Sequence, residues 1–174
     1  LDNFLTPLSI RGNRMKKIYL MCVMLILILI GCKKNEVTFD KLYEEQGFFL
    51  LQDTNKKYTG KVLEYYQNGE IKYDAELKDG KFIGEVKEFY KNGQLQILDR
   101  YENGMLNGES LHYYESGELL SKGKYVNGKE EGEFYEYYEN GQVRTISTYK
   151  DGVLNGILRV YREDGEIESE ITYK

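Results

Sequence analysis

The sequence has 174 residues, of which 41% are hydrophobic and 30% are charged, a composition that excludes a chain disordered throughout. Its 17 tyrosines and 18 glycines, beside a single proline and no tryptophan, favour strands and tight turns over helices. The formal net charge is −5, and the part from Gly60 to Lys174 carries 15 lysines and arginines against 23 aspartates and glutamates. Such an acidic body argues against nucleic-acid binding, since the phosphate backbone selects basic surfaces.

The first fourteen residues, LDNFLTPLSIRGNR, precede the first methionine of the chain. We interpret residues 1–14 as an upstream, mistranslated segment and Met15 as the initiator. Met15 and two lysines are followed by thirteen uncharged, almost wholly apolar residues that end at Ile30. The positive start, the short apolar run and the small residue Gly31 predict a signal peptide over residues 15–31. The run is shorter than the roughly 20 residues that a membrane-spanning helix needs, which favours cleavage over a permanent anchor.

The end of this segment, Leu29-Ile30-Gly31-Cys32, resembles the lipobox of bacterial lipoproteins. The resemblance implies that Cys32 carries a diacylglycerol and becomes the first mature residue, with a fatty acid such as palmitate on its amino group. Two such lipid groups suffice for stable membrane anchoring. The expected protein is exported and anchored in the cell envelope, in the outer membrane if the cell has two, because Lys33 gives no aspartate-type retention signal. The alternative is that Cys32 simply follows an uncleaved anchor.

The stretch from residue 32 to 46 is mostly polar and has no strong hydrophobic period, which predicts a short tether. Residues 47–59 contain an aromatic and aliphatic run, a turn and Tyr58, but they do not match the segments that follow. An atypical unit in front of a repeat array is expected to cover its first repeat. We therefore predict an N-terminal capping unit over residues 47–59.

A repeat of 24 residues, without insertions, occupies residues 60–174. It is marked by three series of glycines: Gly60, Gly84, Gly108, Gly132 and Gly156; Gly69, Gly93, Gly117, Gly141 and Gly165; and Gly80, Gly104, Gly128 and Gly152. Those of the second and third series follow asparagine, aspartate or, once, serine. Asx-Gly pairs are the strongest short-range signal for a β-hairpin turn, because both residues tolerate positive φ. Each repeat is thus predicted to contain two strands and two turns.

Apolar or aromatic residues recur in three columns between the turns. The columns are Tyr65, Phe89, Tyr113, Tyr137 and Tyr161; Ile71, Leu95, Leu119, Val143 and Ile167; and Leu77, Tyr101, Tyr125, Tyr149 and Tyr173. A further column, Tyr66, Tyr90, Tyr114 and Tyr138, breaks at Arg162. Adjacent positions point to opposite faces of a strand, so both faces carry aromatic side chains. This predicts an all-β fold, an elongated single-layer antiparallel β-meander built from five 24-residue β-hairpin repeats.

The register of the hairpins has two interpretations. A two-residue Asn-Gly turn would pair Tyr66 with Ile71, whereas a three-residue turn with a glycine bulge would put Tyr65 and Ile71 on one face. The second is favoured, because it forms an aromatic and aliphatic pair in all five repeats.

The pattern G-x-x-x-x-Y-Y-x-N-G-x-h, with a following Y-x-N-G, resembles the bacterial variant of the MORN repeat. The resemblance covers Thr59 to Lys174 in five copies. Related bacterial proteins include antitoxins of the YwqK type, which implies binding and neutralising a toxin. Eukaryotic MORN segments occur beside phosphatidylinositol phosphate kinase domains, but this sequence contains no nucleotide loop of the G-x-x-x-x-G-K-[ST] kind.

Catalytic and metal-binding residues are not predicted. The single histidine, His112, takes a strand position occupied elsewhere by Glu64, Glu88, Glu136 and Val160, and no partner acid or nucleophile can be assigned to it. We interpret it as an exposed strand histidine. The carboxylates follow the solvent-facing positions of the repeat, and the nonapeptide of calcium-binding β-rolls is absent from the sequence. The sequence therefore favours a protein that is not an enzyme and needs no cofactor.

The first aromatic column is the candidate partner-binding site, and we call it the aromatic row: Tyr65, Phe89, Tyr113, Tyr137 and Tyr161. A one-layer sheet cannot bury both faces, and exposed tyrosines are favoured at interfaces. One ring per hairpin corresponds to a spacing of roughly 10 Å, two strand separations. Tyr161, in the last repeat, is expected to be more exposed than the interior rings. Packing alone is the alternative role of the row.

These observations favour a binding or scaffold module with two kinds of partner: the membrane, through lipid on Cys32, and an unknown protein or glycan. Immunity to a toxin is a special case of binding. A structural role in the envelope is an alternative. An enzyme, such as a carboxylate-based hydrolase, would need a non-repeated acidic or histidine cluster in a pocket.

Overall fold

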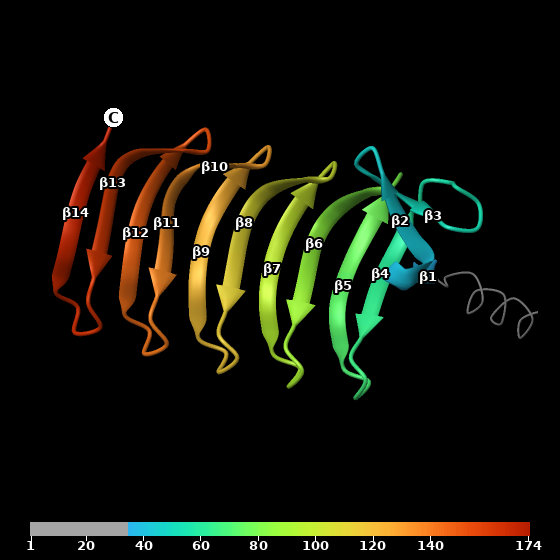
Figure 1. Ribbon diagram of the computed structural model, residues 1–174, viewed down its shortest axis with the longest axis horizontal. Coiled ribbons are helices and arrows are strands. Elements are labelled where there is room, and N and C mark those ends of the chain that lie inside the picture. The colour runs from blue at the N-terminus through green and yellow to red at the C-terminus, as the bar shows by residue number, and fades with distance from the viewer. Residues whose placement is uncertain (1–34) are drawn as a thin grey trace, which may run out of the picture. The chain divides into compact units, whose positions relative to one another are not determined.

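The computed structural model of the protein describes residues 35–174; the predicted signal peptide and Cys32 lie outside this range. The main sheet has twelve strands (Figure 1). They are β1 (Glu36–Val37), β4 (Gly60–Tyr65), β5 (Ile71–Lys78), β6 (Lys81–Phe89), β7 (Leu95–Glu102), β8 (Met105–Tyr113), β9 (Leu119–Val126), β10 (Lys129–Glu130), β11 (Gly132–Tyr137), β12 (Val143–Lys150), β13 (Val153–Tyr161) and β14 (Ile167–Tyr173). A short helix η1 (Phe39–Lys41) precedes a two-stranded sheet of β2 (Leu42–Glu45) and β3 (Phe48–Leu51).

The strands from β4 to β14 lie side by side in chain order, and each is antiparallel to its neighbours. The short strand β10, which precedes β11 in the chain, also pairs with β9. Strand β1 pairs in parallel with β4. The meander forms a single layer of curved strands (Figure 1). The predicted all-β meander of five hairpins is confirmed. No helix within residues 35–174 is long and apolar enough to cross a membrane.

The turn inside each hairpin is a three-residue loop with a glycine bulge. In the first repeat the Tyr66 amide donates to the Glu70 carbonyl at 2.8 Å, and the Gly69 amide donates to the Tyr66 carbonyl at 3.0 Å. Gly69 has a φ of 89°, which an L side chain rarely adopts. Asn68 Oδ1 accepts from the Glu70 amide at 3.2 Å. Tyr65 is therefore opposite Ile71, which confirms the favoured register, and the equivalent pair recurs in all five hairpins.

The turn between hairpins is a two-residue loop with positive φ at both central positions, as in a type I′ turn. After β5 these positions are Asp79 and Gly80, with φ of 50° and 78°. The Gly80 amide also donates to the Tyr58 carbonyl at 2.7 Å. Equivalent bonds join Gly104 to Phe82, Gly128 to Leu106 and Gly152 to Glu130. Each connecting turn is thus attached to the segment that lies one repeat earlier.

The second tyrosine column attaches each hairpin to the next one. The Tyr66 hydroxyl donates to the Phe89 carbonyl, and the same 2.7 Å bond recurs from Tyr90 to Tyr113, from Tyr114 to Tyr137 and from Tyr138 to Tyr161. All four hydroxyls are partly buried. The column is therefore a structural device between neighbouring repeats.

Removing one of these hydroxyls is expected to weaken the array. Tyr114→Phe should lower the free energy of unfolding by about 0.5–1.5 kcal/mol, because the Tyr137 carbonyl loses its tyrosine donor. Urea denaturation followed by circular dichroism measures this change. Tyr65→Phe is the control, since the Tyr65 ring is 51% exposed and makes no such bond between repeats. Equal stability of the two variants would contradict a role for the column in joining hairpins.

The best-packed part of the described chain lies at its N-terminal end. Leu42, Tyr58, Val62 and Leu77 form a buried cluster there. Partly buried side chains of the N-terminal segments and of β6 pack against it: Val37, Phe39, Phe49, Leu51 and Phe82. Strand β1 covers part of the outer edge of β4, which would otherwise expose unpaired backbone groups.

The capping unit is longer than the sequence predicted. Residues 36–45, assigned above to the tether of residues 32–46, contain β1, η1 and β2 and contribute to the cluster. Only a few apolar side chains, Val37, Phe39 and Leu42, connect this segment to the core, and they show neither a strand nor a helix period. The folded cap therefore begins at Glu36, and residues 47–59 are its second part.

Burial falls along the array away from the cap. Every buried hydrophobic residue in the described range lies at or before Val86, and every residue of β14 is exposed. The gradient arises because the cap covers only the N-terminal end of the sheet, whereas farther along each hairpin is covered only by its neighbours.

Candidate binding surface

The aromatic row is placed by the hairpin turns. Its members are the last residues of β4, β6, β8, β11 and β13, and each lies at a register shift just before a turn. Neighbouring residues of a strand point to opposite faces, so the row shares one face of the sheet with the residues two positions earlier. We call this face the row face. The row carbonyls from Phe89 to Tyr161 each accept a hydrogen bond from a tyrosine of the preceding repeat.

Positive and negative side chains are paired on the row face. The ion pairs include Lys61–Asp74 at 3.1 Å, Lys87–Glu85 at 2.8 Å and Arg159–Glu170 at 2.5 Å, each from a side-chain nitrogen to a carboxylate oxygen. All six side chains are at least a quarter exposed, so each pair adds little stability. The pairs instead leave the surface around the rings close to neutral.

The fourth repeat concentrates aromatic surface on the row face. Tyr135 and Tyr137 stack with their ring centroids 6.2 Å apart and an interplanar angle of 16°. The ammonium group of Lys122 lies 4.8 Å from the Tyr135 ring centroid and 5.9 Å from that of Tyr137. Tyr135 donates a hydrogen bond to Glu133, which raises the pKa of the Tyr135 hydroxyl. The two rings and the lysine form a preorganised contact area.

The most accessible ring of the row is Tyr65, not Tyr161. Tyr65 is 51% exposed, whereas Tyr161 and the other three members are half-buried. Tyr65 and Leu63 border a hollow of about 290 Å³ between β4 and the cap, which is also lined by Glu36, Val37, Thr38 and Lys41. The expectation that Tyr161 would be the more exposed end ring was wrong.

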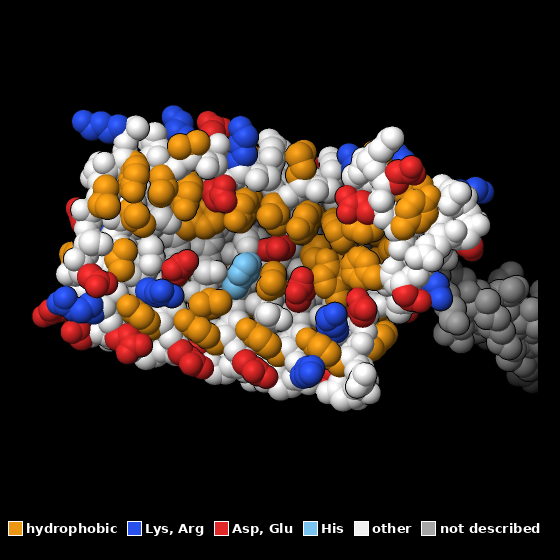
Figure 2. All heavy atoms as spheres, viewed as in Figure 1, with side chains coloured by type: hydrophobic (Ala, Val, Ile, Leu, Met, Phe, Trp, Pro, Cys, Tyr) orange, Lys and Arg blue, Asp and Glu red, His pale blue; other side chains and the backbone are white. Residues whose placement is uncertain are grey.

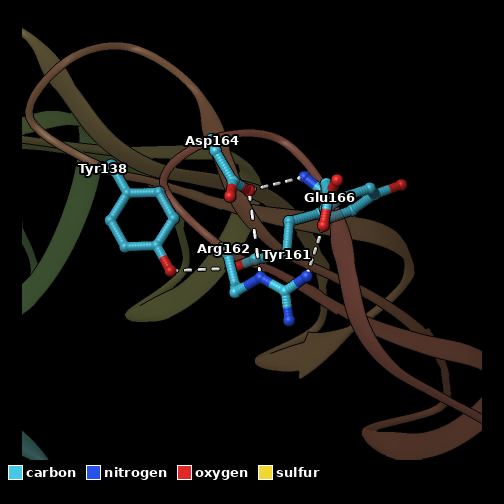
Figure 3. A network of polar contacts seen from close by, with 5 residues as sticks. All are labelled: Tyr138, Tyr161, Arg162, Asp164 and Glu166. Atoms are coloured by element: carbon cyan, nitrogen blue, oxygen red, sulfur yellow. Dashed lines mark hydrogen bonds and ion pairs between the residues drawn. The ribbon is translucent and has the colours of Figure 1, made fainter.

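Contacts with side chains of the last hairpin explain why Tyr161 is half-buried. The Arg159 guanidinium donates to the Tyr161 hydroxyl at 3.3 Å. Arg162 replaces the tyrosine that joins hairpins elsewhere, and its guanidinium donates to Glu166 at 2.5 Å and lies 3.9 Å from Asp164 (Figure 3). Tyr138 still reaches the Tyr161 carbonyl from the preceding repeat. The break in the column at Arg162 is thus a local charge network in the last turn.

Aromatic contacts form a band across the opposite face, which we call the band face. One group of rings contains Phe39, Phe49, Tyr73, Phe82 and Tyr101, and a second contains Tyr125, Phe134 and Tyr149, with centroid separations of 4.9–6.4 Å. Figure 2 shows the hydrophobic band with the histidine and several acidic side chains beside it. Burial raises the pKa of the Tyr73, Tyr101 and Tyr125 hydroxyls. The third column of the repeat is therefore mainly a packing element.

A polar cluster that does not recur in the other repeats lies between the two aromatic groups of the band. Asp99 on β7 is directly opposite Ser110 on β8, and His112 follows Ser110 on the same face. Ser110 is buried, and its Oγ lies 3.4 Å from His112 Nε2. His112 is half-buried, so its interpretation as an exposed histidine was wrong.

Asp99 and Ser110 were missed by the sequence analysis, although a signal was present. Asp99 stands where other repeats have Ala75, Gly123, Ser147 and Ile171, and Ser110 stands where they have Val62, Val86, Phe134 and Leu158. Both are polar exceptions in mainly apolar or small columns. Comparing all columns for exceptions, and not only the aromatic ones, would have found them.

The cluster does not have the geometry of a serine hydrolase. In such a triad the histidine lies between the serine and the carboxylate, with a hydrogen bond to each. Here Asp99 Oδ1 is buried without a hydrogen-bond partner among residues 35–174. Within the same range no group of three or more His, Cys, Asp or Glu side chains is arranged to hold a metal ion.

Comparison with protein families identifies the repeat. The model described as MORN repeat variant matches residues 58–79, 83–105, 106–127, 130–151 and 154–174. Together these segments make up more than half of the 174 residues. The chain belongs to the MORN repeat variant family. The matched MORN segments coincide with the five hairpins, so the aromatic row contributes one ring from each MORN repeat.

Other comparisons add little to the family assignment. No curated protein matches the chain significantly. Among solved structures, a chain from the "Crystal structure of GtfA/B complex bound to UDP and GlcNAc" is similar at 12% identity, over 80% of this chain and 27% of that chain. Its TM-score of 0.26 is too low to support an argument about fold or function.

Proposed function

We propose that this MORN repeat protein is a lipid-anchored binding module of the bacterial cell envelope, which holds a protein or glycan partner along its row face and performs no catalysis. One observation carries the proposal. The row places an aromatic ring at the same position of five successive hairpins, and its first ring, Tyr65, is 51% exposed beside a hollow. A ladder of this kind suits an extended partner that stacks against successive rings.

The surroundings of the row support contact with a partner. The charges of the row face are paired, so a partner need not separate an unmatched charge from water. The hydroxyls of the neighbouring tyrosine column hold the row carbonyls in place, which reduces the ordering cost of binding. Repeat arrays use such extended surfaces for binding.

The row proposal is tested by replacing Tyr65. We expect Tyr65→Ala to reduce the recovery of a partner from envelope extracts at least fivefold, while the melting temperature changes little because the ring is 51% exposed. The measurement is affinity capture followed by mass spectrometry and glycan analysis. Tyr173→Ala is the matched control, since Tyr173 is 37% exposed and lies outside the row. Equal recovery by both variants would leave the row with a packing role only.

The anchor is tested at Cys32, which lies outside the described residues. The Leu29-Ile30-Gly31-Cys32 sequence supports lipid attachment to the Cys32 thiol. Cells fed a fatty-acid analogue should label the wild-type protein, and Cys32→Ser should abolish the label and release the chain from the membrane fraction. Full labelling of the Cys32→Ser variant would refute lipid anchoring at this residue.

Two narrower roles belong to the same proposal. The resemblance to YwqK-type antitoxins supports immunity, in which the partner is a toxin that the protein neutralises by direct binding. In that case, cells that produce the toxin encoded by a neighbouring gene should stop growing, and co-expression of this protein should restore their growth. A structural envelope protein would instead be abundant and self-associate without a specific ligand, which cross-linking in cells would detect.

A further inference from the structure

The first backbone carbonyl of the aromatic row differs from the other four. The row carbonyls from Phe89 to Tyr161 each accept a 2.7 Å hydrogen bond from a tyrosine hydroxyl of the preceding repeat. Tyr65 belongs to the first repeat, and no tyrosine hydroxyl within residues 35–174 donates to its carbonyl. The acceptor that receives a phenol group elsewhere along the row therefore lacks one at Tyr65.

The Tyr65 carbonyl points away from β5 and toward the cap. The Lys61 amide donates to the Asn35 carbonyl at 2.8 Å, so Lys61 directs its backbone groups to the outer edge of β4. Backbone groups alternate between the two edges of a strand, which places those of Tyr65 on the same outer edge. The Tyr66 amide confirms this direction, because it donates inward to the Glu70 carbonyl of the same hairpin.

The cap covers only the beginning of this outer edge. Strand β1 pairs with Lys61 and Val62 and ends at Val37, and the chain then turns into η1. Beside the uncovered end of β4 lies the hollow of about 290 Å³, lined by Leu63 and Tyr65 and by residues of the cap. In the second repeat, β5 of the preceding hairpin pairs with the equivalent part of β6. The hollow thus lies where the first repeat lacks a preceding hairpin.

A phenol ring suits the hollow in size and in chemistry. An apolar cavity of about 150 Å³ is enough to hold a benzene molecule. Leu63, which is 8% exposed, and the half-buried Val37 supply apolar walls. Glu36, Thr38 and Lys41 contribute polar groups to the same lining. A ring with a single hydroxyl matches this combination, because tyrosine buries its apolar body while its hydroxyl finds a polar partner.

We propose that the hollow beside Tyr65 binds the phenol ring of a tyrosine side chain from a protein partner, whose hydroxyl donates to the Tyr65 carbonyl. The partner thereby supplies the contact that the preceding repeat supplies at the other four row carbonyls. A second copy stacked end to end would not supply it, because the last repeat has Arg162 at the tyrosine position, bound to Glu166. The site rests on the proposed binding function, since it lies at the first ring of the row.

The test uses the detergent-solubilised full chain, with N-acetyl-tyrosine amide as the probe. N-acetyl-phenylalanine amide, which lacks only the hydroxyl, is titrated in parallel. NMR follows the Leu63 methyl groups and the Tyr65 carbonyl carbon, which is observed through the Tyr66 amide. We expect saturable shifts of both signals with the tyrosine probe. The phenylalanine probe should bind about fivefold more weakly, because it cannot donate the hydrogen bond.

Three variants locate the bound probe. Thr38→Phe fills the hollow and should weaken binding at least tenfold. Glu44→Phe is the matched control, since it adds the same ring at an exposed position of the cap that does not line the hollow, and it should keep the affinity within twofold. Tyr65→Phe should also keep the affinity within twofold, because the accepting group is the backbone carbonyl and not the side-chain hydroxyl.

Other results would overturn the site. A flat titration, or equal affinity for the two probes, would show that the hollow does not recognise a phenol. Shifts that persist in Thr38→Phe with an unchanged melting temperature would place the probe elsewhere. If Thr38→Phe destabilises the cap, the comparison of the two probes on the wild-type protein still decides.

Failure of this site can be separated from failure of the row. A flat titration together with loss of partner capture by Tyr65→Ala would exclude the tyrosine site and leave the row as a binding surface. Saturable probe binding together with unchanged capture by Tyr65→Ala would refute partner binding by the row and leave the hollow as a phenol site.

Discussion

Replacing Leu77 by alanine is expected to lower the free energy of unfolding by about 2–5 kcal/mol. Leu77 and Val62 have no exposed surface, and Leu77 packs in the cluster that joins the cap to the first repeat. The cap packs over Leu77, so the truncation would leave a cavity between the cap and the sheet. Chemical denaturation of the purified variant measures the loss.

The control for Leu77→Ala is Ile171→Ala at the other end of the array. Ile171 is 51% exposed on β14, and its truncation should change stability by less than about 0.5 kcal/mol. Because the repeats contact only their neighbours, hydrogen exchange in Leu77→Ala should increase in the cap and the first hairpin more than in β13 and β14. A uniform increase along the chain would show a single cooperative unit in place of a modular array.

Deleting one complete repeat, residues 108–131, should leave a shorter folded protein, whereas deleting only residues 108–119 should prevent folding of the array. Removal of 24 residues brings Tyr137 into the position of Tyr113, so the Tyr90 hydroxyl still finds a backbone carbonyl. Removal of twelve residues places a connecting turn where a hairpin turn is required, and the two have different lengths and glycine conformations. Circular dichroism and thermal melting distinguish the two products.

Two results would argue against modular stacking. Loss of structure in both deletions would mean that the third repeat holds contacts beyond its neighbours. Retention of cooperative melting by the twelve-residue deletion would mean that the bonds between repeats, such as Tyr90 to Tyr113, do not set the register.

The hairpin array was predictable from the sequence because its determinants are local. An Asx-Gly pair specifies positive φ within a few residues, as at Asp79 and Gly80, and a period of 24 residues repeats that requirement along the chain. The favoured register followed from pairing Tyr65 with Ile71, which are separated only by one turn. The family assignment depends on the same local pattern.

The extent of the cap was decided by tertiary contacts. Val37, Phe39 and Leu42 show no period in the sequence, and their burial appears only when they meet Tyr58, Val62 and Leu77. Tertiary contacts also determine how exposed the rings of Tyr65 and Tyr161 are at the two ends of the aromatic row. Arg159 of the same hairpin contacts Tyr161, whereas the cap leaves a hollow beside Tyr65.

The sequence by itself determined the repeat, the turns and the aromatic row, because each depends on residues that are close together along the chain. Only the tertiary structure decided which side chains share a face across strands. A bulge in every hairpin shifts the pairing of the strands by one residue, so the spacing of residues along the sequence could not show that Asp99 lies opposite Ser110. The uncompensated oxygen of Asp99 follows from that pairing, since a buried acceptor is recognised only when all of its neighbours are known.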